Sequence, residues 1–200
     1  TGYYGQRAPR WVMRVKAIDV SRTDMYARVE DVVLEASPLK PLRGLIHVQQ
    51  LGARSVDHLE ATGEEGIRQL AASDVVGVLL PVAALVLGRP MPRARELVDA
   101  GAAIALATDF NPGSAFCESL PLVCSLACTQ LRLSPAEALG AVTVNASHVL
   151  RRADHLGRLV PGYDADVVLL EAPDWRYLAY HMGGEVVSAV VQSGRLVWRR

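Results

Sequence analysis

Cysteine is scarce in this 200-residue sequence, and neither sign of charge is in excess. The three cysteines, Cys117, Cys124 and Cys128, are odd in number and closely grouped, which argues against the disulfide framework of a secreted domain. We therefore expect a reducing, cytoplasmic environment. Acidic and basic residues balance at 21 each, so the charge predicts neither nucleic acid nor an anionic membrane as a partner.

Apolar runs long enough to cross a membrane are also missing. Residues 75–87 form one of the longest apolar stretches, but Gly77 and Pro81 interrupt it, and a span takes roughly 20 residues. The first segment contains scattered arginines and does not resemble a signal peptide. Because half of the residues are hydrophobic, we expect a soluble globular chain of one domain, or one domain with a small appendage.

From about residue 50 onward, helix-like and strand-like segments alternate. Residues 63–73 and 90–101 have the amphipathic pattern of helices, and the second begins with prolines and ends with a glycine. The apolar runs 75–80 and 103–108 are short enough to be buried strands, and residues 29–35 are a further candidate strand. This alternation predicts βα units and a parallel sheet.

Two further helices are expected after residue 110. The first covers about residues 118–130. The second begins at Ser134, which fits an N-cap, with Pro135 at the first helical position and Glu137 as the carboxylate of a capping box. Beyond about residue 155 the sequence is rich in β-forming and turn residues, which predicts a small sheet rather than another βα unit.

Cys124 and Cys128 lie four residues apart, so on a helix they would share one face and could bind a metal. Their neighbours are apolar, and free thiols are common in protein cores. No second pair of ligands lies nearby in the sequence. We therefore interpret both cysteines as packing residues.

Asp109 and His58 stand where two strand-like runs end. In a parallel α/β sheet or barrel, functional groups gather at these ends, so the two side chains should point into the same mouth. There they could ligate a divalent metal or transfer a proton. Taken alone, Asp109 also fits turn chemistry with the Asn-Pro-Gly that follows it, and His58 fits a structural histidine. We interpret His148 and His155, at an apparent helix end, as surface or capping residues.

Three motifs follow one another in the second half of this sequence: ALATDFNPGS, LACTQLRLSPAEALGAVTVNASHVL and GRLVPGYDADVVLL. They resemble the C-terminal half of the imidazolonepropionases, a family of metal-dependent amidohydrolases of histidine breakdown. Two earlier segments, LGARSVDHLEATGEEGI and VGVLLP, fit the same order. The resemblance therefore extends from about residue 39 to the C-terminus.

This resemblance implies a fold and an activity. The family folds as a (β/α)₈ barrel of the TIM type, joined to a small β-sandwich made from both chain ends. Residues 1–154 would then form part of the hydrolase barrel, and residues 155–200 a β-rich part of the sandwich. Family members use one zinc or iron ion to hydrolyse the ring amide of 4-imidazolone-5-propanoate, a small-molecule substrate, to N-formimidoyl-L-glutamate.

The resemblance also implies roles for individual residues. Asp109 would be the metal-ligating aspartate at the end of the last barrel strand. His58 matches a catalytic histidine at an earlier strand end, near the metal and the substrate. The residues implied in substrate binding are Asn111, Gly113 and Ser114, and also Tyr3 in TGYYGQ, which looks like the family's Ser/Thr-Gly-Tyr-Gly element.

Two features depart from the family pattern. The His-X-His pair of the first barrel strand has no counterpart, because no two histidines here are separated by one residue. A further histidine ligand is replaced by Glu35 if the sequences are aligned without gaps, with Pro38 at the position of its acid partner. His47 takes that place if about a dozen residues are deleted after it. We favour the gapless alignment because Pro41 and Gly44 then also match.

These departures leave three hypotheses open. The chain is an imidazolonepropionase-type hydrolase, or a truncated and inactive amidohydrolase remnant, or another amidohydrolase such as a nucleobase deaminase. A full family member is about twice this length, so we expect a barrel with strands missing. Unpaired strand edges favour association, so a homo-oligomer or another chain bound through those edges is expected.

Overall fold

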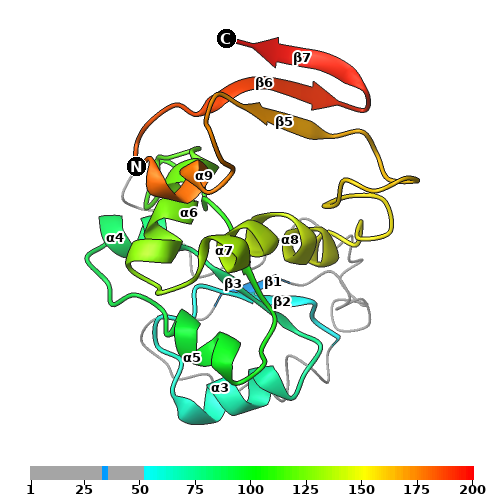
Figure 1. Cartoon of the computed structure of the whole chain (residues 1–200). Coiled ribbons are helices and arrows are strands. Elements are labelled where there is room, and N and C mark those ends of the chain that lie inside the picture. Colours follow the sequence, from blue (N-terminus) through cyan, green and yellow to red (C-terminus); the bar gives the residue numbers. More distant parts are fainter. Residues whose placement is uncertain (1–32, 36–51) are drawn as a thin grey trace.

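The computed structural model describes residues 33–35 and 52–200, which form two sheets with helices around the first (Figure 1). The first sheet has the order β1-β2-β3-β4, and its strands are Val33–Glu35, Ser55–Asp57, Val76–Leu79 and Ile104–Leu106. Every neighbouring pair is parallel, which confirms the predicted parallel sheet. The carboxyl ends of all four strands therefore lie at one edge of the sheet.

Helices connect these strands and cover the sheet. Helix α3 (Glu64–Ala71) follows β2, and α4 (Pro81–Val86) and α5 (Ala94–Asp99) lie between β3 and β4. After β4 come α6 (Leu120–Thr129), α7 (Pro135–Val142) and α8 (Val144–Val149). In Figure 1, α3 and α5 lie on one side of the strands, and α7 and α8, which contact β4, lie on the other.

Prolines mark two of the places where the observed helices differ from the predicted ones. The helix expected at 90–101 begins only at Ala94, because Pro92 disfavours a helical conformation in the residue before it. Its end is as predicted, with Gly101 in the left-handed region at φ 90°. The sequence did not indicate α4, whose Pro81 occupies the first helical turn, where proline is tolerated.

The core lies between the sheet and its helices. Leucines from several elements are completely or almost completely buried there, namely Leu59, Leu70, Leu79 and Leu97. Gly77 in β3 makes room for two of them, since a Cβ atom at Gly77 would lie 2.7 Å from Leu59 Cδ1 and 3.0 Å from Leu70 Cδ2. A glycine inside a strand is therefore explained by close packing rather than by a turn.

The predicted capping box of α7 is confirmed. The Ser134 hydroxyl accepts a hydrogen bond from the Glu137 backbone N–H, and the Ser134 N–H donates to Glu137 Oε2 at 2.7 Å. Arg95 of α5 donates to the same carboxylate at 3.0 Å, which links the two helices. These hydrogen bonds from Ser134 and Arg95 hold the pKa of Glu137 below its ordinary value.

The second sheet contains the β-rich region expected beyond residue 155. Its three antiparallel strands are β5 (Val167–Leu170), β6 (Val187–Gln192) and β7 (Arg195–Arg199), in that order. A short helix that the sequence did not indicate, α9 (Tyr177–Tyr180), lies between β5 and β6 and packs on α6.

The architecture implied by the resemblance is present in part. Among the residues described, the first sheet is open rather than closed into a barrel, and the second is a single sheet rather than a sandwich. The strands of the first sheet all precede residue 107, and those of the second all follow residue 166. Helices long and apolar enough to cross a membrane are not found in the described part of the chain.

Candidate functional site

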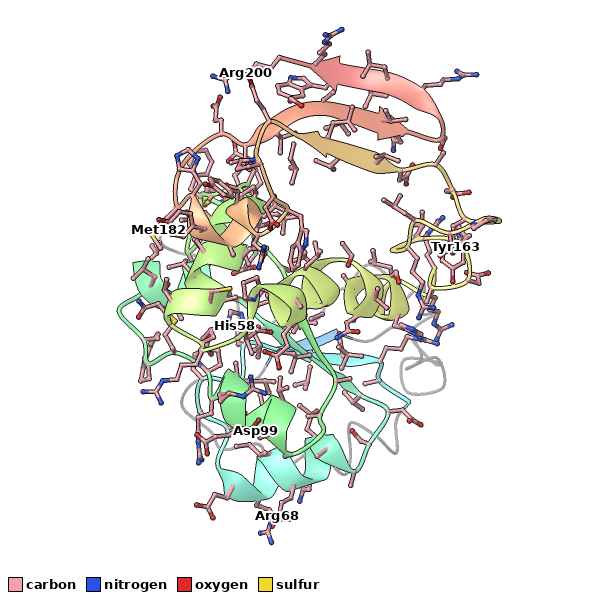
Figure 2. The ribbon with its side chains drawn as sticks, viewed as in Figure 1. His58, Arg68, Asp99, Tyr163, Met182 and Arg200 are labelled. Atoms are coloured by element: carbon pink, nitrogen blue, oxygen red, sulfur yellow. The ribbon has the colours of Figure 1, made fainter. Side chains whose placement is uncertain are left out.

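His58 and Asp109 follow two strands of the first sheet at the same edge. His58 comes directly after β2, and its backbone N–H donates to the Val78 carbonyl of β3 at 2.9 Å. Asp109 follows β4, and two residues before it the Ala107 N–H donates to the Leu79 carbonyl of β3 at 3.3 Å. The prediction that parallel strands bring these two residues to one mouth is thus consistent with the backbone hydrogen bonds on either side of β3. Figure 2 shows His58 near the centre of the molecule.

The loop after Asp109 is organised by the side chain of Asn111. Asn111 Oδ1 accepts hydrogen bonds from the backbone N–H groups of Gly113 and Ser114, both at 2.8 Å. Asn111 Nδ2 donates to the Asp109 carbonyl at 2.6 Å and to Ser114 Oγ at 3.0 Å. This network closes the Asp109–Ser114 turn on itself and fixes where the Asp109 side chain begins.

The Asp109 carboxylate lies in a partly buried and electrostatically crowded place. Burial raises its pKa above the ordinary value, while nearby His58 lowers it, as does a hydrogen bond from Ser114 Oγ at 3.4 Å. The negative charge of Glu60 acts in the direction of burial and raises the pKa further. His58, Glu60 and Asp109 therefore lie within electrostatic reach of one another.

Glu60 belongs to this site, although the sequence did not indicate it. Its carboxylate Oε1 lies 3.4 Å from His58 Nδ1, and only 6% of its side chain is exposed. The chain reaches this arrangement through two successive residues with left-handed backbone, His58 at φ 75° and Leu59 at φ 70°. The signal available in the sequence was a carboxylate two residues after a strand-end histidine, which is common and unspecific.

The structure brings together most of the residues expected to form the site. His58, Asp109, Asn111, Gly113 and Ser114 all lie at the carboxyl end of the first sheet or in the loop that follows it. Tyr3 and His47 lie outside the described residues. The backbone of Glu35 ends β1 and pairs in register with Asp57 of β2, so Glu35 stands at the same edge of the sheet as His58.

The described residues do not form a complete metal centre. Nitrogen and oxygen donors such as those of His58 and Asp109 suit zinc, but a catalytic zinc site takes three protein ligands and an open position. Among the residues that the structure describes, no group of three His, Cys, Asp or Glu side chains could hold an ion. A metal ion bound at Asp109 would therefore need further ligands beyond the side chains that the structure describes.

The cysteines pack as expected. Cys124 is buried in α6, and burial raises the pKa of its thiol to about 11. Burial also raises the pKa of Cys128, which is less enclosed. Cys128 lines a surface cavity of about 660 Å³ together with Tyr177, Tyr180 and Met182, but none of the strand-end residues reaches that cavity.

Comparison with known proteins gives a consistent picture. A model of the amidohydrolase family matches residues 39–197. An imidazolonepropionase from Rubrobacter xylanophilus is 62% identical over 148 residues, which is 74% of this chain and 36% of the relative. A probable imidazolonepropionase from Nematostella vectensis is 40% identical over 218 residues, or 98% of this chain and 51% of the relative. The chain thus spans between a third and about half of the length of these curated relatives.

The fold is also similar to that of a solved enzyme. A variant of the atrazine chlorohydrolase from Arthrobacter aurescens TC1, complexed with zinc and atraton, matches with a TM-score of 0.70. The match covers 94% of this chain and 46% of that one, at 21% identity. Identity this low supports the fold alone, which is the TIM-barrel-like fold of amidohydrolases, here with only part of its strands among the described residues.

Proposed function

The chain belongs to the amidohydrolase family, whose model matches most of it, and from this premise we propose that it serves imidazolonepropionase chemistry. The reaction is hydrolysis of the ring amide C–N bond of 4-imidazolone-5-propanoate to N-formimidoyl-L-glutamate. The observation that carries the proposal is the loop from Asp109 to Ser114, ordered by Asn111 and lying within electrostatic reach of His58. The names of the two curated relatives favour this substrate over a nucleobase.

Each residue has a role that follows from its chemistry. His58 is the group able to carry a proton between water and the leaving nitrogen near neutral pH. The backbone and hydroxyl of Ser114, together with Gly113, offer hydrogen-bonding groups close to Asp109 for the polar ends of the substrate or product. Asp109 is proposed as one ligand of a zinc or iron ion. Tyr3 remains a proposed substrate contact.

When such an ion is bound in an amidohydrolase, it supplies a water of lowered pKa for attack at neutral pH. The side chains that the structure describes supply too few ligands for this, so activity depends on further ligands. Glu35, at the same edge of the sheet, is one proposed source. We also propose a cytoplasmic location, because all three cysteines are free.

To test the proposed hydrolysis, the full chain is incubated with Zn²⁺ or Fe²⁺ and 4-imidazolone-5-propanoate, and the N-formimidoyl-L-glutamate formed is measured by mass spectrometry. Metal-dependent product formation supports the proposal, provided that Asp109→Asn and His58→Ala abolish it. Glu185→Gln changes an exposed carboxylate before β6 and should leave the rate unchanged. A rate at the background level for every metal, with no product binding detectable by calorimetry, would overturn the proposed activity of this chain.

A second candidate function is a non-catalytic member of the family. The observation in its favour is that no three side chains among the described residues could hold a metal ion, together with Pro38 at the position of an acid partner in the gapless alignment. Metal analysis separates the two candidates. A folded chain that retains one equivalent of metal after dialysis contradicts the non-catalytic role, whereas a folded chain that loses all its metal supports it.

A further inference from the structure

Glu60 is a buried carboxylate at the strand-end site with no role assigned so far. Its side chain is 6% exposed, and among the described residues its hydrogen-bond and ion-pair partner is Nδ1 of His58. Burying a carboxylate is costly unless it is paired and hydrogen-bonded. A buried carboxylate beside the proton-carrying residue therefore requires an explanation in terms of that residue.

The backbone between the two residues is held in an unusual conformation. His58 and Leu59 both have φ near 70°, in the left-handed region. Histidine adopts this region more readily than most residues, whereas a bulky leucine seldom does. Such conformations persist where the surroundings enforce them, and they cluster at functional sites. The turn they make carries the Glu60 side chain back to the His58 ring.

The packing of Leu59 against β3 holds the turn in this conformation. Leu59 is completely buried and sits over Gly77 of β3, where even one added methyl group would come within 2.7 Å of its side chain. The Leu59 side chain therefore occupies the space that a side chain at position 77 would need. This fit anchors the two left-handed residues on the sheet and fixes the distance between His58 and Glu60.

We propose that Glu60 is a positioning residue that accepts a hydrogen bond from Nδ1–H of His58. This hydrogen bond sets the ring orientation and the tautomer, and it leaves Nε2 as the unprotonated nitrogen for proton transfer. The role rests on the proposed function of His58. Glu60 acts through His58 and does not itself touch the substrate.

The direct test is the tautomer of His58, read from the ¹⁵N chemical shifts of the ring in the full chain. In the unmodified chain at a pH where the ring is neutral, Nδ1–H should predominate. Glu60→Gln retains an oxygen acceptor and should keep that tautomer. Glu60→Met has similar length but no acceptor and should shift the ring toward Nε2–H. A ring that is mainly Nε2–H in the unmodified chain overturns the proposal, without reference to any variant.

Turnover gives a second and separable readout. In a preparation that hydrolyses the imidazolone substrate, Glu60→Met should lower kcat roughly tenfold to a hundredfold with little change in KM, because the ring is mispositioned while the binding loop is intact. Glu60→Gln should recover most of the rate. Glu64→Met, at an exposed position in α3, is the matched control and should behave like the unmodified chain.

The two proposals fail in different ways. If no preparation turns over the substrate but His58 keeps the Nδ1–H tautomer only when residue 60 carries an acceptor, the proposed activity fails and the positioning contact stands. If turnover occurs and Glu60→Met leaves both kcat and the tautomer unchanged, the positioning role fails and the proposed activity stands.

Discussion

Asn111 shows at the scale of one residue how the site is built. Its single amide group accepts from two backbone N–H groups and donates to the Asp109 carbonyl, so three backbone groups of a six-residue turn depend on it. Unlike a flexible polar loop, such a turn places Asp109 before any ligand binds. The conformational entropy of the loop is therefore lost when the chain folds and need not be lost again when a ligand binds.

Removing that amide should loosen the turn. Asn111→Ala leaves the Gly113 and Ser114 N–H groups without their acceptor, so we expect a loss of about 1–3 kcal/mol in the free energy of unfolding. Urea denaturation measures the loss, and hydrogen exchange of those two amides should accelerate. Asn111→Asp keeps the acceptor and should protect both amides. Unchanged exchange in Asn111→Ala would contradict this account of the loop.

Cys124 gives a second prediction at the residue scale. Its thiol is buried and its pKa is raised to about 11, so the reactive thiolate is a very small fraction at pH 7.5. In the folded chain, iodoacetamide should therefore label Cys117, which is only partly buried, well before Cys124. Peptide mass spectrometry over time measures both rates. Equal rates that persist in the native protein would show that α6 does not pack as described.

At the scale of the element, Gly77 connects strand β3 to the turn beneath the site. Gly77→Ala places a methyl group against two buried leucines, and we expect overpacking to cost about 1–3 kcal/mol. Gly140→Ala in α7 is the control, because nothing lies within 4 Å of its added Cβ atom and alanine favours the helix by about 1 kcal/mol. Thermal unfolding should therefore move in opposite directions for the two variants. If Gly77→Ala unfolded at a higher temperature than the unmodified chain, Leu59 would not pack against Gly77 as described.

The capping box of α7 makes stability depend on pH. The pKa of Glu137 is held below its ordinary value near 4.5, so the carboxylate stabilises the folded state above that value. This contribution is lost as the pH falls through the lowered folded pKa. Glu137→Gln can still cap but cannot lose a charge, so its stability should fall less between pH 6 and pH 3. Parallel pH profiles of the melting temperature for the two proteins would exclude this contribution.

Elements that local sequence determines were predictable, and elements held by distant contacts were not. Ser134, Pro135 and Glu137 mark the start of α7 because capping is complete within one turn of chain. The convergence of His58 and Asp109 followed from the rule that parallel strands end at one edge. By contrast, α9 has four residues and depends on packing against α6, and a hydrophobic pattern cannot reveal that contact.

Glu60 escaped prediction for a related reason. Its approach to His58 requires left-handed backbone at a histidine and a leucine. A histidine-leucine pair does not predict such a turn from sequence, whereas glycine or asparagine would. The cause lies in β3, at Gly77, about twenty residues along the chain. A contact made possible by a missing side chain on a neighbouring strand leaves no local pattern in the sequence.

At the scale of the whole molecule, both sheets have strand edges without a strand partner among the residues described. In the second sheet the edge strand β7 is exposed along its whole length. Val168, Val190 and Trp198 are paired across β5, β6 and β7, and the two outer members of this row are about half exposed. Exposed edges and apolar rows of this kind favour pairing with another chain.

We therefore expect this chain to self-associate through β7 and the row that contains Trp198. Sedimentation velocity should give a sedimentation coefficient that rises with protein concentration. Trp198→Thr keeps a residue that favours strands but removes most of the apolar surface, so it should weaken association. Arg199→Thr changes the neighbouring position, whose side chain points to the opposite face of the strand. This variant should retain most of the association. If the unmodified chain sediments as a monomer at every concentration, the exposed edge of the second sheet does not drive assembly, and a different surface or partner must cover this row.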